Sequence, residues 1–229
     1  MIKLEKGPVP EVLQENSDQW KETLLEKLSL GTATPAEKAR YRHPQIKAAL
    51  EAETFGKCAY CESKLKHVHH GDVEHIVPKS LKPELTFKWE NLTLACEICN
   101  QNKSDKDPEH FQILDPYITD PNLHFMFLGA FIADVGTPQG ICTRLILDLD
   151  RSELVERRRE KLDKIISILG RVSRTDLPIE VRKAILNNAR TQDGAVSAEY
   201  SAMVNTVLNE FLRHLPSELR DAGCPTSRF

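Results

Sequence analysis

Side chains that can bind metals or move protons gather in one stretch of the 229-residue chain, from Cys58 to Lys103. The stretch contains two Cys-x-x-Cys pairs and, between them, the adjacent residues Glu74 and His75, followed by Asn91. A neutral imidazole accepts a proton near neutral pH, and carboxylate and amide oxygens hold hard divalent cations. These residue types suit the hydrolysis of phosphodiester bonds, in which water loses a proton while charge grows on the phosphoryl oxygens.

The two cysteine pairs predict a zinc site. They are Cys58 with Cys61 and Cys96 with Cys99. In a reducing compartment such pairs are more often metal ligands than disulfides, and four thiolates complete the tetrahedral shell of a zinc ion. Because that shell leaves no position for water, we expect the zinc to be structural. The 34 residues between Cys61 and Cys96 exceed a simple zinc ribbon, which indicates an insertion between the two pairs.

Two alternatives compete with this interpretation. Three histidines of the insertion could replace cysteines as ligands, although an exposed loop is the simpler reading: His67, His69 and His70. The second alternative is a zinc module that binds nucleic acid or protein and performs no chemistry. The set of Glu74, His75 and Asn100 argues against it, because a pure binding module has no reason to keep these residues together.

The cysteine-bounded stretch predicts a ββα unit. We expect strands over Val73–Val77 and Asn91–Ala95, and a helix that begins near Cys99 or Asn100 and continues past Lys103. A unit of this size cannot bury a sufficient core alone, so the bound metal would supply the missing stability.

Neighbouring residues on a strand point to opposite faces, so a strand alone does not bring Glu74 and His75 to one site. A bend near Pro78 or at the strand end, or a metal at the sheet edge, must bring the two side chains to one site. Asn100 would offer an amide oxygen from the start of the helix. Two lysines are placed to contact nucleic-acid phosphates, one in the loop and one on the helix: Lys79 and Lys103.

Apolar residues at helical spacing predict amphipathic helices on both sides of the ββα unit. These helices are expected over residues 10–28, 44–55, 153–170, 178–190 and 195–215. We therefore predict an α+β fold that is predominantly helical. Its parts would be an N-terminal helical region (1–56), the zinc-clamped ββα core (57–107), a mixed connecting region (108–150) and a C-terminal helical region (151–229).

The net charge of −3 does not by itself indicate a nucleic-acid-binding protein. Residues 151–190 are nevertheless basic, with 11 Lys and Arg against 6 Asp and Glu. The basic side chains crowd one side of the helix expected over residues 153–170: Arg157, Arg158, Arg159, Lys161 and Lys164. This face is either simply solvated or serves as a track for phosphates or a docking face for a partner.

No apolar run reaches the ~18–20 residues that a membrane span needs. The first residues have no apolar signal core. We therefore expect a cytoplasmic protein without a membrane partner.

The order of the motif residues resembles the HNH, or ββα-metal, endonucleases in their zinc-knuckle form. Three strings carry the likeness: Glu74-His75-Ile76-x-Pro78, Asn91-Leu92 and Cys96-x-x-Cys99-Asn100-x-x-Lys103. The resemblance implies a metal-dependent endonuclease that cuts DNA or RNA, with Mg²⁺ or Mn²⁺ as the catalytic ion beside the structural Zn²⁺.

By this resemblance His75 is the general base, and Glu74 with Asn100 holds the catalytic ion. Asn91 would be structural and would brace the loop that presents His75, while Lys103 would contact phosphate. Many members have Asp in place of Glu74 and His in place of Asn100, which leaves the metal preference open.

A narrower likeness is to the HNH nucleases of Septu antiphage systems, including those attached to retrons. It rests on Cys58-Ala-Tyr-Cys61-Glu62, on residues 74–80 and on residues 89–96. This likeness implies a defence effector gated by an ABC/SMC-like ATPase, with a reverse transcriptase and its DNA or RNA product as further partners. An HNH nuclease of restriction or repair is the alternative within the family.

Overall fold

A computed structural model describes residues 1–65 and 71–220, so the three histidines of the alternative zinc set lie outside the described part. The chain divides into two compact units, Met1–His124 with Asp134–Leu149 and Phe125–Ala133 with Asp150–Phe229. Helices dominate the described residues, and the strands form two small two-stranded sheets. The predicted fold class, α+β and mainly helical, is confirmed. The division into four regions stays a prediction.

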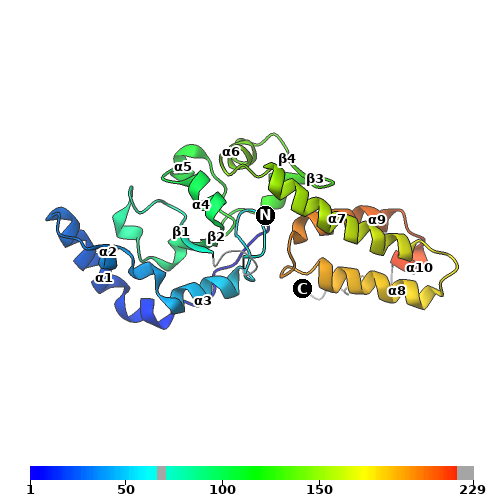
Figure 1. Cartoon of the computed structure of the whole chain (residues 1–229), viewed down its shortest axis with the longest axis horizontal. Coiled ribbons are helices and arrows are strands. Elements are labelled where there is room, and N and C mark those ends of the chain that lie inside the picture. The colour runs from blue at the N-terminus through cyan, green and yellow to red at the C-terminus, as the bar shows by residue number, and fades with distance from the viewer. Residues whose placement is uncertain (66–70, 221–229) are drawn as a thin grey trace. The chain divides into compact units, whose positions relative to one another are not determined.

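The first unit contains the predicted ββα arrangement. Its elements are β1 (Asp72–His75), β2 (Leu92–Ala95) and α4 (Glu97–Lys103). The strands pair antiparallel, which places His75 opposite Leu92 and Glu74 opposite Thr93. In Figure 1, α4 lies against this sheet in the middle of the first unit. All residues of β2 are buried, so the sheet is part of the core that positions the site.

The helix α4 begins earlier than predicted, at Glu97. The Sγ atom of Cys96 accepts a hydrogen bond from the backbone N–H of Cys99 at 3.4 Å, so a cysteine caps the helix. The helix ends at Lys103 and does not run past it. Ser104 follows with φ 50° and ψ −130°, a backbone conformation that terminates the helix.

Four helical segments precede the sheet: α1 (Glu11–Ser29), α2 (Pro35–Lys38), η1 (Arg40–Arg42) and α3 (Pro44–Glu53). The predicted helices over residues 10–28 and 44–55 correspond to α1 and α3. Thr34 and Glu37 form a capping box at the start of α2, and Pro44 occupies the first turn of α3. The helix α3 packs against β2, and α1 packs against α3.

The loop between the two strands contains η2 (Pro83–Leu85) and η3 (Trp89–Asn91). The helix α1 packs against η2, so the N-terminal helices reach the loop that follows β1. Lys6 fastens the first residues to this region, since its Nζ lies 4.1 Å from the centroid of the Trp89 ring and 2.9 Å from Oε1 of Glu53.

The rest of the first unit comprises α5 (Pro108–Phe111), η4 (Pro121–Leu123) and α6 (Pro138–Ile146). Asn102 of α4 donates a hydrogen bond to the carbonyl of Leu147 at 3.2 Å. The segment that follows α6 is therefore tied to the helix of the ββα unit.

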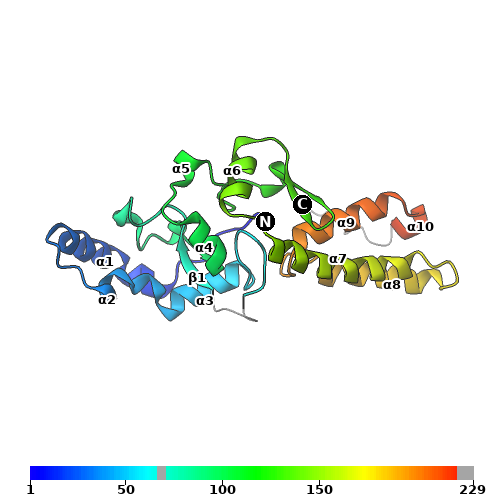
Figure 2. The ribbon, with the colours of Figure 1, turned by 45° about the horizontal axis from the view of Figure 1, so that its top comes forward.

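The second unit is a helical bundle with a short hairpin. Its elements are β3 (Phe125–Leu128), β4 (Phe131–Asp134), α7 (Ser152–Val172), α8 (Ile179–Asn188), the π-helix η5 (Ala189–Asp193), α9 (Ser201–Arg213) and α10 (Ser217–Arg220). The helices α7, α8 and α9 lie side by side in Figures 1 and 2, and β3 packs against α9.

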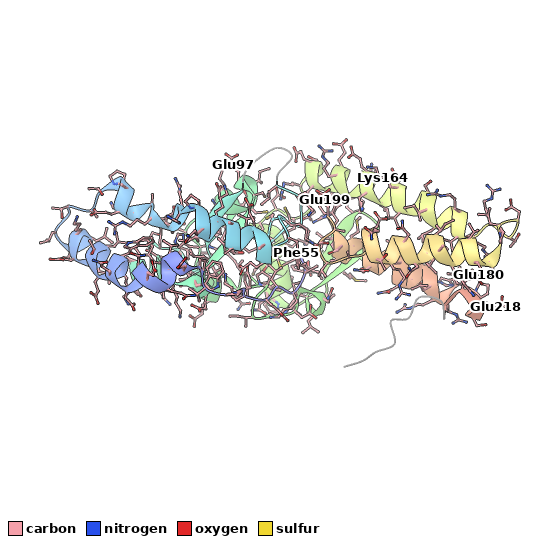
Figure 3. All side chains as sticks on the ribbon, turned by 90° about the horizontal axis from the view of Figure 1, so that it is seen from below. Phe55, Glu97, Lys164, Glu180, Glu199 and Glu218 are labelled. Atoms are coloured by element: carbon pink, nitrogen blue, oxygen red, sulfur yellow. The ribbon has the colours of Figure 1, made fainter. Side chains whose placement is uncertain are left out.

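Two predictions about this unit need correction. The helix expected over residues 195–215 begins only at Ser201, because Tyr200 adopts a left-handed backbone with φ 54°. Arg158, expected on the basic outer face of α7, is 1% exposed, and its guanidinium lies 5.5 Å from the Phe127 ring centroid. Arg157, Arg159 and Lys164 do lie on the exposed side, and Figure 3 labels Lys164 there.

None of the helices in the described part of the chain is both long enough and apolar enough to span a bilayer.

Candidate active site

The four predicted zinc ligands come together beside the ββα unit. Their sulfur atoms all lie within 4.8 Å of one another, and the Sγ atoms of Cys61 and Cys96 are 3.8 Å apart. A tetrahedron with Zn–S bonds of ~2.3 Å has edges of about 3.8 Å, so the spacing fits one zinc ion. Cys58, Cys61 and Cys99 are buried and Cys96 is half-buried. The four-cysteine cluster therefore suggests a structural zinc.

The electrostatics of the cluster also call for a cation. Burial raises the pKa of Cys58, whereas hydrogen bonding with the Cys58 thiol lowers the pKa of Cys61 and of Cys96. Four sulfurs this close cannot all ionise in a buried site without a compensating positive charge. A zinc ion would supply that charge and would hold the turn at Cys58 and Cys61 to the start of α4.

His75, the last residue of β1, is buried and held by a backbone group. Its Nε2 lies 3.0 Å from the carbonyl oxygen of Thr86. A carbonyl oxygen only accepts hydrogen bonds, so we assign the proton to Nε2, which leaves Nδ1 as the basic nitrogen. The Tyr41 ring packs edge-on against the imidazole, with centroids 4.5 Å apart.

The surroundings keep the imidazole neutral. Burial, and after it the positive charge of Lys79, lowers the pKa of His75 to about 4. At neutral pH the ring is therefore a proton acceptor, which is the state that a general base requires.

Glu74 is buried and paired with a lysine. The Nζ of Lys103 lies 2.8 Å from Oε1 of Glu74 and donates to the backbone carbonyl of His75 at 2.9 Å. Burial raises the pKa of Glu74, and the charge of Lys103 opposes that rise. The Lys103 side chain is 0% exposed, so a contact with phosphate would require this ion pair to open. Lys103 thus links the side chain of Glu74 to the backbone of His75 inside the fold.

Asn100 is oriented by a residue that the sequence did not single out. Its Nδ2 donates to Oδ2 of Asp72 at 3.0 Å. This hydrogen bond fixes the orientation of the amide and does not involve the amide oxygen. The available signal was spacing: Asp72 and Glu74 are two residues apart on β1 and so share a face of the strand.

Asn91 braces the loop between the two strands. Its Oδ1 accepts from the N–H of Val77 at 2.8 Å, and its Nδ2 donates to the carbonyls of Val77 and Leu85 at 3.0 and 3.2 Å. These three bonds close the loop that contains Thr86, whose carbonyl holds His75. The contacts of Asn91 are those of a bracing residue.

Glu74, His75 and Asn100 line one cavity of about 470 Å³ in the first unit. The strand β1 ends at His75, so the chain turns there and both neighbours reach the same space. The other lining residues come from the N-terminal helices, the loop and the end of α4: Leu24, Leu28, Lys38, Pro78, Lys79, Ser80, Pro83, Thr86, Ser104 and Asp105.

The cavity offers the donor types that a hard cation prefers. Glu74 contributes a carboxylate and Asn100 an amide oxygen, and Mg²⁺ and Mn²⁺ are bound in proteins through such oxygens together with water and substrate phosphates. The residues present therefore fit an ion of this type.

A family model described as HNH endonuclease matches residues 58–106, which contain the cysteine cluster, β1, β2 and α4. Residues outside this match, among them Leu24, Leu28 and Lys38, complete the wall of the cavity.

Two relatives are similar to the chain. A Septu protein PtuB from Bacillus thuringiensis is 37% identical over 82 residues, which span 35% of this chain and 32% of that protein. A Septu protein PtuB from Bacillus mycoides (strain KBAB4) is 26% identical over 268 residues, covering 93% of this chain and 91% of that protein. The first similarity spans about a third of the relative and the second nearly all of it.

Proposed function

Since residues 58–106 form an HNH endonuclease domain and the chain is homologous to Septu protein PtuB over most of its length, we propose that it cuts a nucleic acid within a Septu-type antiphage system. The observation that carries the chemistry is the shared cavity, in which a neutral imidazole, a carboxylate and an oriented amide face one space.

In the proposed reaction the Nδ1 atom of His75 takes a proton from the attacking water. The Thr86 carbonyl holds the ring in the required tautomer, and Tyr41 limits its rotation. Glu74 and Asn100 would hold Mg²⁺ or Mn²⁺, which when bound stabilises the charge that develops on the phosphoryl and leaving oxygens. Lys79, exposed at the cavity, contacts a substrate phosphate.

The direct test is cleavage of plasmid, single-stranded DNA and tRNA with Mg²⁺ or Mn²⁺. We expect His75→Ala to lower cleavage by about 10²-fold or more, since general bases contribute on the order of 10²–10⁴. Zinc content and thermal stability are measured on the same sample. Equal cleavage by His75→Ala and wild type, at equal zinc content, would refute the assignment of the base.

A second candidate is a zinc module that binds nucleic acid or protein without cutting it. It is favoured by the burial of the reacting groups, since Glu74 is 6% and His75 4% exposed. Absence of cleavage on every substrate and with every metal, combined with binding that His75→Ala leaves unchanged, would favour this module. An HNH nuclease of restriction or repair is the third hypothesis, and a co-purifying ATPase would argue against it.

We further propose that a partner gates the activity. The homology to Septu protein PtuB supports a system context, and the expected partner is an ABC/SMC-like, PtuA-like ATPase, with a reverse transcriptase and its product in retron-associated systems. The exposed residues Arg157 and Arg159 of α7 are the candidate docking residues. Charge reversal at both is expected to release the partner in gel filtration, and an unchanged elution profile would exclude this face.

A further inference from the structure

The cavity that contains the reacting groups has a wall that the HNH domain does not supply. Leu24 and Leu28 from α1 and Lys38 from α2 face the same space as Glu74 and His75. These three residues precede the matched segment by 20 residues or more. The N-terminal helices therefore shape what can reach the imidazole.

Both apolar and cationic side chains line this part of the cavity. Leu24 and Leu28, four residues apart on α1, form the apolar part of the wall, in which Leu24 is buried and Leu28 is exposed. Lys38 and Lys79 are exposed lysines that both line the cavity. An apolar surface suits the face of a nucleobase, and ammonium groups suit phosphates.

The dimensions of the cavity suit one nucleotide. A cavity of about 470 Å³ falls in the ~300–1,000 Å³ range that encloses a single small ligand, which is the size class of one nucleotide. The reacting groups are almost wholly buried, so the scissile phosphate must enter the cavity to meet them. In a duplex each base is stacked and paired inside the helix, so it cannot lie against the apolar wall without being unpaired, whereas the bases of an unpaired strand can do so at once.

From this geometry we infer that the site takes an unpaired nucleotide strand, with one base against Leu24 and Leu28 and its phosphates between Lys38 and Lys79. Single-stranded nucleic acid and unpaired loops or bubbles within a duplex meet this requirement. The inference rests on the proposed nuclease function, and it names the substrate class of the same site.

A binding measurement tests the inferred substrate class independently of the cleavage reaction. The 229-residue chain carrying His75→Ala is titrated into one labelled sequence prepared as a single strand, as a perfect duplex and as a duplex with a central unpaired bubble, in both DNA and RNA. We expect the single strand and the bubble to bind at least about tenfold more tightly than the duplex, a difference of ~1.4 kcal/mol. Equal or tighter binding of the duplex, or no binding of any unpaired strand, would overturn the inference.

Two matched pairs of variants locate the strand. Lys38→Gln is compared with Lys47→Gln, a lysine of α3 that does not line the cavity. Losing one phosphate contact with a single strand lowers the slope of log K against log salt by about 0.7, and only Lys38→Gln should do so. Leu28→Asp is compared with Leu30→Asp, which lies outside the cavity. The first should weaken single-strand binding about fivefold or more and the second by less than about twofold.

The outcomes are distinct from those of the nuclease test. If the chain binds unpaired strands in the expected order but wild type and His75→Ala cut equally, the assigned base is wrong and the strand site stands. If cleavage depends on His75 but duplex is bound and cut as well as single strands, the nuclease stands and the strand site falls. Equal effects of Lys38→Gln and Lys47→Gln also refute the strand site.

Discussion

The pKa of His75 is about 4, chiefly because the ring is buried. An ordinary histidine, with a pKa of ~6.5, would be about three-quarters protonated at pH 6 and would be a poor base there. His75 should instead stay neutral, so we expect kcat/KM at pH 6 to match that at pH 7.5. A pH–rate profile checks this, and an acidic limb with a midpoint near ~6.5 would contradict it.

The same shift bears on stability. Because the folded-state pKa of His75 is depressed, the unfolded chain binds more protons between pH ~6.5 and about 4. The contribution of this group to stability is fully present above pH ~6.5 and is lost as the pH falls through that window.

Lys103 and Glu74 form a buried ion pair within the catalytic unit. Lys103→Met leaves a buried carboxylate without its counter-charge, so we expect a loss of about 3–5 kcal/mol in the free energy of unfolding. Urea denaturation followed by tryptophan fluorescence measures it, with Lys106→Met, a lysine near the same helix end, as the control. Equal losses in both variants would show that the Glu74 pair contributes no special stability.

At the scale of elements, the apolar periodicity of residues 153–170 predicts the helix α7 but not the burial of every residue on it. The amphipathic helix was predictable, but the side of Arg158 was not. Its guanidinium lies 5.5 Å from the ring centroid of Phe127 and 5.9 Å from that of Tyr200. Both rings come from other elements, so a helical-wheel argument on α7 alone assigns the arginine to solvent.

Arg158 and Arg157 therefore differ in their effect on stability. We expect Arg158→Ala to lower the free energy of unfolding by on the order of 3 kcal/mol, because the contacts of a buried side chain with two rings are lost and a cavity is left. Arg157, exposed and paired with Glu160, should cost less than about 0.5 kcal/mol when replaced by alanine. Far-UV circular dichroism during urea denaturation measures both. A similar cost for the two variants would contradict the assigned environments.

Most residues of the candidate site could be predicted from the sequence, because their residue types and local spacing indicate their chemistry. Cys58, Cys61, Cys96 and Cys99 meet as expected, and Glu74, His75 and Asn100 share a cavity. What the sequence could not supply depends on distant packing or on unusual caps. In the sequence Asp72 is one of many acidic residues, and only the hydrogen bond from Asn100 singles it out. The Cys-x-x-Cys spacing predicts a metal ligand at Cys96 but not the cap that starts α4.

At the scale of the whole molecule, the two compact units should respond differently to metal removal. Both tryptophans of the sequence, Trp20 and Trp89, lie in the first unit, which also contains the cysteine cluster. We expect a chelator strong enough to take zinc from thiolates to change tryptophan fluorescence while much of the helical circular dichroism of the second unit persists.

Cys58→Ser should reproduce the effect of the chelator, and Cys142→Ser, which alters a cysteine outside the cluster, should not. Zinc content measured on each sample completes the comparison. Simultaneous and complete loss of both signals would show that the two units unfold as one.

Asn91 can affect the orientation of the His75 ring without contacting it. Its side-chain amide donates to the carbonyls of Val77 and Leu85, on either side of the loop between the strands. That loop places the Thr86 carbonyl within hydrogen-bonding distance of the His75 imidazole. We expect a change at this asparagine to lower cleavage although Asn91 does not line the cavity, and a screen that scores only activity would count it as part of the chemistry. Its true role would be visible in the orientation of a ring on a neighbouring strand.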